Sequence, residues 1–208
     1  MNVREVLSEI DLRGSVARLR PPRAEDSELT FRLIAGRREI LDWLEWSGPA
    51  TAQDMLDQAL HWRKESDDAA NYQLAILRAP REGDEREEVV GAMSIRFIDH
   101  PERGDLGYWI APEHQGQGLA SDAVGLAAWL AFEVLEASSV SACVFVPNVA
   151  SRRVLEKHGF SLREEASCAA SCDERPRWNF LLDRSAWILR AAALRPLEFH
   201  FAFTPARP

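Results

Sequence analysis

A glycine-rich turn between a strand-like run and a helix-like run is the part of this sequence best suited to bind an anion. The turn is Gln115-Gly116-Gln117-Gly118-Leu119-Ala120, and the run before it ends at Pro112. After the turn, apolar residues recur at helical spacing, at 119, 123, 126, 127, 130 and 134. Unpaired N–H groups and the dipole at a helix N-terminus favour an anion, most often a phosphate. The sequence therefore predicts a phosphate-binding loop here.

Two common phosphate loops do not fit this turn. A P-loop requires a lysine directly after its last glycine, and Leu119 follows Gly118. A dinucleotide-binding loop requires a third glycine where this chain has Ser121. The pattern that remains is Gln-x-x-Gly-x-Ala, from 115 to 120.

A second polar motif follows the predicted helix. It consists of Asn148 and Ser151, and then the run Leu155-Glu156-Lys157-His158-Gly159-Phe160. Together the two motifs resemble those of the GNAT superfamily of N-acyltransferases, in the branch of the RimJ and RimL ribosomal-protein N-terminal acetyltransferases. The resemblance covers about residues 90–185. It implies an N-acetyltransferase that moves an acetyl group from acetyl-CoA to a primary amine by direct transfer in a ternary complex.

The resemblance also implies which residues contact acetyl-CoA. Amides of the loop would hold the pyrophosphate, and the strand before it would pair with the pantetheine arm beside a splayed gap. The expected contacts are Trp109, Ile110, Ala111, Gln115, Gly116, Gln117, Gly118, Leu119, Ala120, Asn148, Ser151, Arg153 and Lys157. Helix-surface solvation explains Arg153 and Lys157 equally well, and Asn148 also suits a helix N-cap.

Ser151 and Asp105 are the candidate catalytic residues. By resemblance Ser151 is the general acid that faces the departing sulfur, and an ordinary helix serine is the alternative. Many family members carry a tyrosine acid where this chain has Leu155, which cannot donate a proton. Asp105 is the candidate base, with a structural hairpin carboxylate as the alternative. An α-amine with a pKa of ~8 costs only about 1.4 kcal/mol to deprotonate at pH 7, so a weak base suffices.

The acceptor site is expected from aromatic residues outside the two motifs. Trp43, Trp46 and Tyr108 are the candidate substrate contacts, and Trp62 extends the same set. An aromatic wall favours a cationic amine, while core packing is the alternative for these tryptophans. The acceptor is expected to be a protein N-terminal α-amine or a small-molecule amine, chosen by residues 30–66 and 167–177. Two other functions remain open: an acyl-CoA-binding regulator without turnover, and an acyltransferase that uses a longer acyl-CoA.

Charge, cysteine content and hydropathy indicate which binding partners and which cellular compartment to expect. The formal charge of -8 argues against nucleic-acid binding and suits a cationic substrate, although solubility alone also explains it. The three cysteines form no even disulfide framework, and no metal site is expected. No signal peptide or membrane-spanning run is visible, so we expect a cytoplasmic protein with reduced thiols. The resemblance adds that homodimers are common in the family.

The elements that must position these residues follow from periodicity. Strands are expected at 16–20, 71–77, 89–98, 104–111, 139–146, 162–168 and 177–182, and helices at 24–34, 52–64, 118–135, 148–158 and 183–194. Antiparallel strands come first and a strand–helix–strand–helix section follows, which indicates one α/β (α+β) domain. Its mixed, mostly antiparallel central sheet is flanked by helices, and by resemblance strands 4 and 5 splay apart. The core is expected over about 15–190, with a tail at 195–208 that adds an edge strand or packs on a partner.

Overall fold

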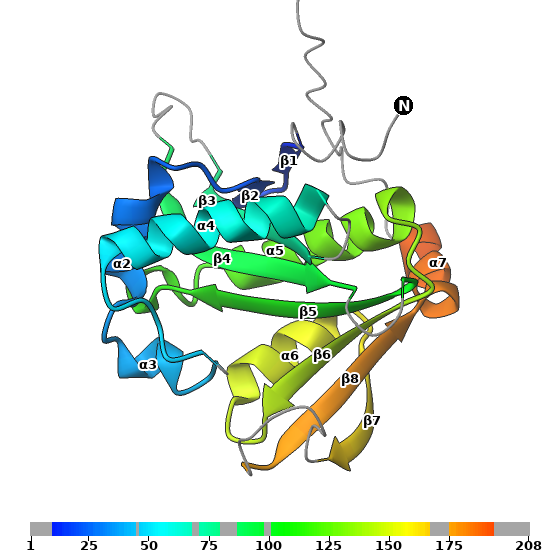
Figure 1. The fold of residues 1–208 in the computed structure, drawn as a ribbon. Helices are drawn as coiled ribbons and strands as arrows, with labels where there is room; N and C mark the ends of the chain where they lie inside the picture. The colour runs from blue at the N-terminus through cyan, green and yellow to red at the C-terminus, as the bar shows by residue number, and fades with distance from the viewer. Residues whose placement is uncertain are drawn as a thin grey trace, which may run out of the picture.

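The computed structural model describes residues 10–44, 46–67, 71–79, 87–97, 101–166 and 175–193. Eight strands form one sheet in the order β1-β2-β3-β4-β5-β6-β8-β7 (Figure 1). The strands are β1 (Leu12–Arg13), β2 (Ala17–Arg20), β3 (Asn71–Arg78), β4 (Val89–Arg96), β5 (Arg103–Ile110), β6 (Ser139–Phe145), β7 (Ser161–Ala166) and β8 (Arg177–Asp183). The helices are α2 (Asp26–Ile34), α3 (Arg38–Leu41), α4 (Ala52–Asp67), α5 (Leu119–Trp129), α6 (Val149–Lys157) and α7 (Arg184–Ala193). A 3-10 helix (Pro112–His114) precedes α5, and a π-helix (Leu130–Val134) extends it.

The sheet divides where β5 and β6 meet. This is the one parallel pair among the described strands, and it covers only the stretch from Arg103 beside Ser139 to Asp105 beside Ser141. Beyond it β5 continues to Ile110 and β6 to Phe145 with no pairing between them. The mixed, mostly antiparallel sheet and the splay between the fourth and fifth predicted strands are thus confirmed. We call the opening between the strands the fork.

Helices cover the sheet on both faces, with α4 on one side and α5 on the other (Figure 1). Side chains alternate along a strand, so successive residues of β5 serve different layers. Leu106 and Ile110 pack into the main core with α5 residues such as Leu126. Trp109 packs instead on a smaller cluster that contains Leu33 of α2. We therefore distinguish the α5 face of the fork, which receives the even-numbered residues of β5, from its α4 face, which receives the odd-numbered ones.

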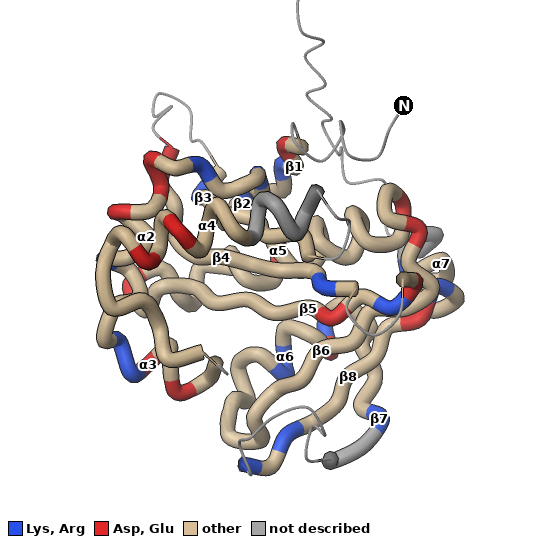
Figure 2. Tube along the Cα trace, in the orientation of Figure 1, with Lys and Arg blue, Asp and Glu red and all other residues tan. Residues whose placement is uncertain are grey.

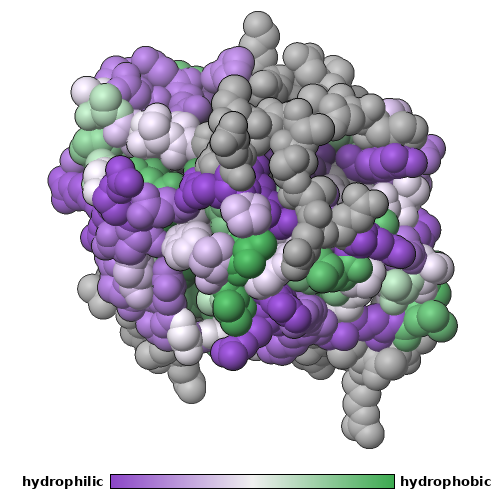
Figure 3. Space-filling model, turned by 90° about the horizontal axis from the view of Figure 1, so that it is seen from below, coloured by the Kyte–Doolittle hydropathy of each residue, from purple (hydrophilic) through white to green (hydrophobic). Residues whose placement is uncertain are grey.

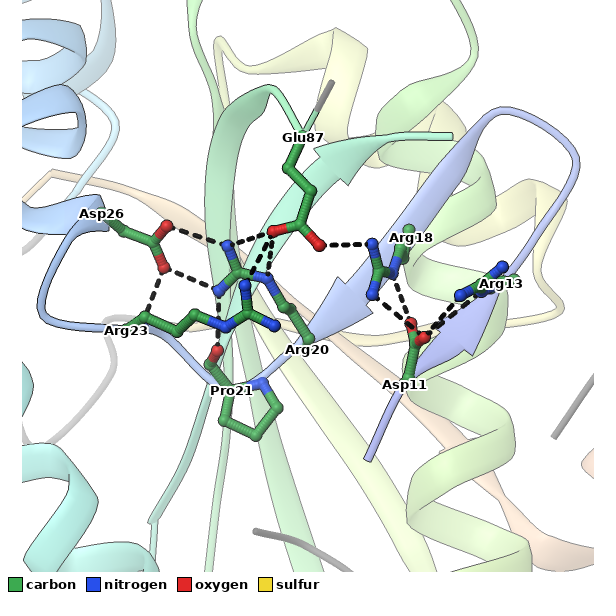
Figure 4. Close-up of polar contacts among 8 residues, drawn as sticks. All are labelled: Asp11, Arg13, Arg18, Arg20, Pro21, Arg23, Asp26 and Glu87. Atoms are coloured by element: carbon green, nitrogen blue, oxygen red, sulfur yellow. Dashed lines mark hydrogen bonds and ion pairs between the residues drawn. The ribbon is translucent and has the colours of Figure 1, made fainter. Parts of the chain in front are cut away.

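A network of arginines and carboxylates joins β2 to α2 (Figure 4). Arg20 is 4% exposed, and its guanidinium donates to both carboxylate oxygens of Asp26, at 2.7 and 2.9 Å. It also donates to Glu87 at 3.0 Å, and Arg18 links Glu87 to Asp11. Each charge faces an opposite one inside the chain, which compensates the burial of Arg20. The network holds the start of α2, and through it the segment that leads to α3.

Most predicted elements are present, with boundaries that move by a few residues, but two features differ. The core was expected to begin at about residue 15, yet Ile10 and Leu12 are buried and β1 pairs with β2. Two isolated apolar residues give no periodicity from which such a strand is predicted. The helix expected to 135 ends its α-helical part at Trp129 and continues as the π-helix. The tail 195–208 lies outside the described residues.

Candidate active site

A cleft of about 640 Å³ opens at the fork. It is lined by residues 39, 40, 43 and 44 around α3, 106–110 of β5, 114–116 and 118–121 of the glycine-rich turn, 142–145 of β6, and 147–151 and 154 at α6. Its size lies in the range of small-molecule sites. At the end of the molecule seen in Figure 3, apolar patches interrupt a largely hydrophilic surface. The fold thus brings both sequence motifs and α3 to one cavity.

The glycine-rich turn has the backbone of an anion-binding loop. Gly116 and Gly118 have φ values of +72° and +82°, a region that favours glycine. Gly118 is the N-cap residue of α5, with no side-chain cap, and the first helical bond is donated by the Asp122 N–H to Gly118 O at 2.9 Å. The amides between them therefore lack helical partners. They lie where Leu119 and Ala120 line the cleft, so this loop fits a phosphate group.

Side chains on either side hold this loop in place. Gln115 Nε2 donates to Ile110 O at 2.8 Å, which ties the turn to the end of β5. The Asp122 carboxylate accepts the N–H groups of Val16 at 2.7 Å and Ala17 at 2.8 Å, which fixes α5 against β2. The amide cradle is therefore preorganised by contacts from two strands.

Arg78 of β3 braces the outer side of the turn. Its guanidinium donates to Glu88 at 2.9 Å and to the Gln117 side chain at 2.8 Å, and lies 3.0 Å from His114 Nδ1. It places a cation beside the predicted phosphate loop. Sequence reasoning missed Arg78 because it is 39 residues from Gln117 and belongs to no motif.

Most of the predicted acetyl-CoA contacts line the cleft, and four do not. Those in the wall are Trp109, Ile110, Gln115, Gly116, Gly118, Leu119, Ala120, Asn148 and Ser151. Gln117 points to Arg78, Ala111 is fully buried, and Arg153 and Lys157 are exposed on α6 away from the wall. Figure 2 shows basic positions on α6. A contact from Arg153 or Lys157 remains a prediction and requires a ligand that extends beyond the cleft.

Asn148 and Ser151 occupy the start of α6 at the fork. Asn148 Oδ1 accepts the Ser151 N–H at 3.1 Å, so Asn148 caps the helix. The Ser151 hydroxyl lies 2.8 Å from the Tyr108 hydroxyl, which crosses the fork from β5. Burial raises the pKa of Tyr108 to about 12, partly offset by the bond to Ser151, and the phenol stays protonated at neutral pH. The Tyr108 hydroxyl therefore faces Ser151 inside the cleft, and its contact with the acceptor remains a prediction.

Two residues of the second motif serve packing. Leu155 is fully buried in the main core. Its side chain has no proton to donate, so it packs and takes no part in proton transfer. His158 Nε2 lies 3.0 Å from Ser121 Oγ and joins α6 to the start of α5. Burial, with nearby Arg190 and Lys157, lowers the pKa of His158 to about 4, so the ring is neutral at pH 7.

Asp105 lies at the root of the fork and not in the cleft wall. Its carboxylate is ion-paired with Arg96, and the Ser141 hydroxyl approaches it at 3.4 Å. It shares the α4 face of β5 with Gly107 and Trp109, opposite Tyr108. The ion pair forms because the β4–β5 register places Arg96 beside Asp105. This register could not be predicted from the sequence of either strand alone. The role of Asp105 as a base remains a prediction, and from this position it would act through a water molecule.

The α3 wall supplies an acidic residue that sequence reasoning missed. Glu39 is exposed and is the one acidic side chain among the described residues that line the cleft. Trp43 lines the same wall, whereas Trp46 lies at a smaller cavity of about 40 Å³ beside Trp109. A substrate contact from either tryptophan remains a prediction. Arg175 donates to Asp42 O at 2.6 Å and anchors the segment after α3. The side chain of Trp62 lies outside the described residues.

Cys143 also lines the cleft, and it is disulfide-bonded. The expectation of reduced thiols is therefore wrong for this residue. Disulfide formation depends on the approach of two Cα atoms in space, which sequence spacing does not show. Cys168 and Cys172 lie outside the described residues.

Two expected absences concern metals and membranes. Within the described ranges, no three side chains of His, Cys, Asp or Glu gather as a metal site would require. None of the helices in the part of the chain that the structure describes has both the length and the apolarity needed to cross a bilayer.

Comparison with known proteins agrees with this geometry. Residues 17–161 match the family described as Acetyltransferase (GNAT) domain. The chain is 29% identical over 145 residues to "Putative ribosomal N-acetyltransferase YdaF" of Bacillus subtilis (strain 168). The aligned region covers 68% of this chain and 74% of that protein. Among solved structures, RimJ of Mycobacterium smegmatis in complex with CoA-disulfide superposes with a TM-score of 0.72 at 22% identity, over 88% of this chain and 93% of RimJ. RimL, a ribosomal L7/L12 α-N-protein acetyltransferase in complex with coenzyme A, gives 0.73 at 16% identity, over 85% of this chain and 99% of RimL.

Proposed function

Since the chain belongs to the GNAT family and is an acetyl-CoA-dependent N-acetyltransferase, we propose that it passes the acetyl group directly to a primary amine in a ternary complex. The amine is a protein N-terminal α-amine or a small-molecule amine. The observation that carries the proposal is the fork, which has the glycine-rich turn at one end and a hydroxyl pair inside it. Donor and acceptor can then meet between β5 and β6 from opposite faces of the sheet.

The α5 face holds the donor. Amides of the glycine-rich turn bind the pyrophosphate, and Arg78 adds positive charge beside it. Beyond Asp105 the edge of β5 that faces the fork pairs with none of the described strands. Apart from Ile110 O, which accepts from Gln115 Nε2, the N–H and C=O groups of this edge can pair with an extended amide chain. Bound acetyl-CoA supplies the activated acetyl group, and Ser151 protonates the departing sulfur.

The α4 face admits the acceptor. Gly107 lies between Asp105 and Trp109 on this face, and its missing side chain leaves the middle of β5 uncovered. The α3 wall borders the same opening with Trp43 and Glu39. Positioning of two reactants in such an opening accounts for ~7–11 kcal/mol of barrier reduction in well-oriented reactions.

Asp105→Asn is expected to lower kcat/KM by about tenfold, most steeply below neutral pH, because a base that acts through water contributes little once the amine is neutral. The control is Arg96→Gln, which keeps the carboxylate and removes its ion-pair partner. The measurement is the pH profile of both variants. Equal losses at every pH would show that the pair serves only the sheet, and would remove Asp105 as the base.

Glu39→Gln is expected to raise KM for a cationic acceptor up to about fivefold, the range of exposed ion pairs, and to leave KM for acetyl-CoA unchanged. The matched control is Glu113→Gln, because Glu113 is bonded to Arg37 at 2.6 Å and does not line the cleft. Steady-state kinetics at low and high salt test this, since the effect should shrink as salt rises. An unchanged acceptor KM at low salt would contradict the role.

The decisive experiment is CoA release from acetyl-CoA with a panel of acceptors. The panel holds Ser- and Ala-starting peptides, a peptide with a lysine side chain, polyamines, aminoglycosides and amino acids. Turnover with one class identifies the acceptor. Saturable CoA binding with no turnover across the panel would instead favour the acyl-CoA-binding regulator. Competition with succinyl-CoA and longer thioesters decides whether a longer acyl group is preferred.

A further inference from the structure

Two hydroxyl groups from opposite sides of the fork meet inside the cleft. Tyr108 comes from β5 and Ser151 from the first turn of α6, and their oxygens are 2.8 Å apart. The Ser151 carbonyl oxygen lies 3.5 Å from the same phenol, at the limit of a hydrogen bond. Both residues line the cleft, so the contact is part of its wall.

The chemistry of the two groups decides which one donates. A phenol is a stronger acid than an aliphatic hydroxyl, and Tyr108 stays protonated because burial raises its pKa to about 12. The stronger acid is the better donor, which favours the arrangement in which the Tyr108 O–H donates to Ser151 Oγ. The Ser151 proton is then free to point into the cleft.

We propose that Tyr108 is a positioning residue for the general acid Ser151. Its hydrogen bond directs the Ser151 proton toward the departing sulfur, and its own proton then replaces the one that Ser151 has given up. This role rests on the proposed acetyl transfer. It also compensates for Leu155, which is fully buried and has no proton to donate. The phenol that this chain lacks on α6 is supplied from β5, on the other side of the same fork.

The proton transfers balance without any further reactant. The amine nitrogen bonds to the acetyl carbon and releases one proton to water. The carbon–sulfur bond breaks, the sulfur keeps its electron pair, and it takes the Ser151 proton. Ser151 Oγ takes the Tyr108 proton, and water returns a proton to the phenolate. The net change is one N–H lost and one S–H gained.

The test uses the complex with CoA alone, so that no acceptor is required. Thiolate absorbance in the ultraviolet gives the pKa of the bound CoA thiol. Tyr108→Phe is expected to bind CoA within about twofold of the unaltered chain and to raise this thiol pKa, because Ser151 loses the donor that orients it. The control is Tyr72→Phe, which makes the same change at the only other tyrosine; Tyr72 packs against Phe97 with ring centroids 5.9 Å apart.

Two results would overturn the proposal. One is a thiol pKa that is unchanged in Tyr108→Phe. The other is a loss of CoA affinity with no separate effect on the thiol, which would make the contact structural. A fluorotyrosine label in the Tyr72→Phe background reports Tyr108 alone. Its resonance should follow the titration of the bound thiol, and should cease to do so in Ser151→Ala.

Turnover separates this proposal from the proposed function. With an acceptor identified, Tyr108→Phe should lower kcat about tenfold and cause no further loss in a Ser151→Ala background, because it acts through Ser151. Additive losses would contradict that route. If no amine is acetylated, the proposed function fails, and the thiol measurement still decides the role of Tyr108.

Discussion

Gly118→Leu is expected to lower the affinity for CoA by about 100-fold or more. Gly118 has φ +82°, and a side chain is strained in this conformation. It stands at the N-cap of α5, where the amides that we assign to the pyrophosphate begin. Two charge-assisted hydrogen bonds, each worth about 1.5–3 kcal/mol, account for a loss of this size. Isothermal titration calorimetry with CoA measures it.

The strain of the substitution must be separated from the loss of the site. Gly36 offers the matched control, because its φ is +68° and no atom lies within 4 Å of a Cβ built there. Gly36→Leu should cost comparable stability in urea unfolding and retain CoA affinity. If Gly118→Leu binds CoA as the unaltered chain does, the turn is not the pyrophosphate site.

The parts of the site that were predictable from sequence are those with local causes. The turn at 115–120 needs positive φ at its glycines, and the apolar spacing after it marks α5, so loop and helix followed from neighbouring residues. The Asn148 side chain accepts the N–H of Ser151, three residues later in the sequence, so the N-cap was predicted correctly. The fork was predicted only from the family resemblance. The point at which two strands stop pairing produces no recognisable pattern in the sequence of either strand.

The parts that were missed depend on pairing between distant segments. Arg78 reaches the turn only because β3 and β4 carry it there. Tyr108 meets Ser151 because side chains alternate along β5 and this one lies on the side of α6, which the sequence did not reveal. Asp105 meets Arg96 through the β4–β5 register, nine residues away in sequence. Each outcome depends on which face of a strand a residue takes, and a shift of one residue reverses that face.

Ser151→Ala is expected to lower kcat by about 100-fold, within the range that general acid catalysis contributes, with little change in KM for acetyl-CoA. The binding loop is untouched, and Asn148 accepts the backbone N–H of residue 151, which alanine retains. Steady-state kinetics measure the split between kcat and KM. Ser161→Ala is the control, because that hydroxyl bonds to Leu181 O on β8 and lies outside the cleft wall.

The nature of the leaving group distinguishes an acid from a structural serine. Acetyl-seleno-CoA has nearly the same shape as acetyl-CoA but releases a more acidic selenol, which needs less protonation as it departs. If Ser151 donates that proton, the loss caused by Ser151→Ala should shrink markedly with the selenoester, while a packing defect would reduce both donors equally. An equal loss with both donors would assign the proton to water and leave Ser151 as a residue that shapes the fork.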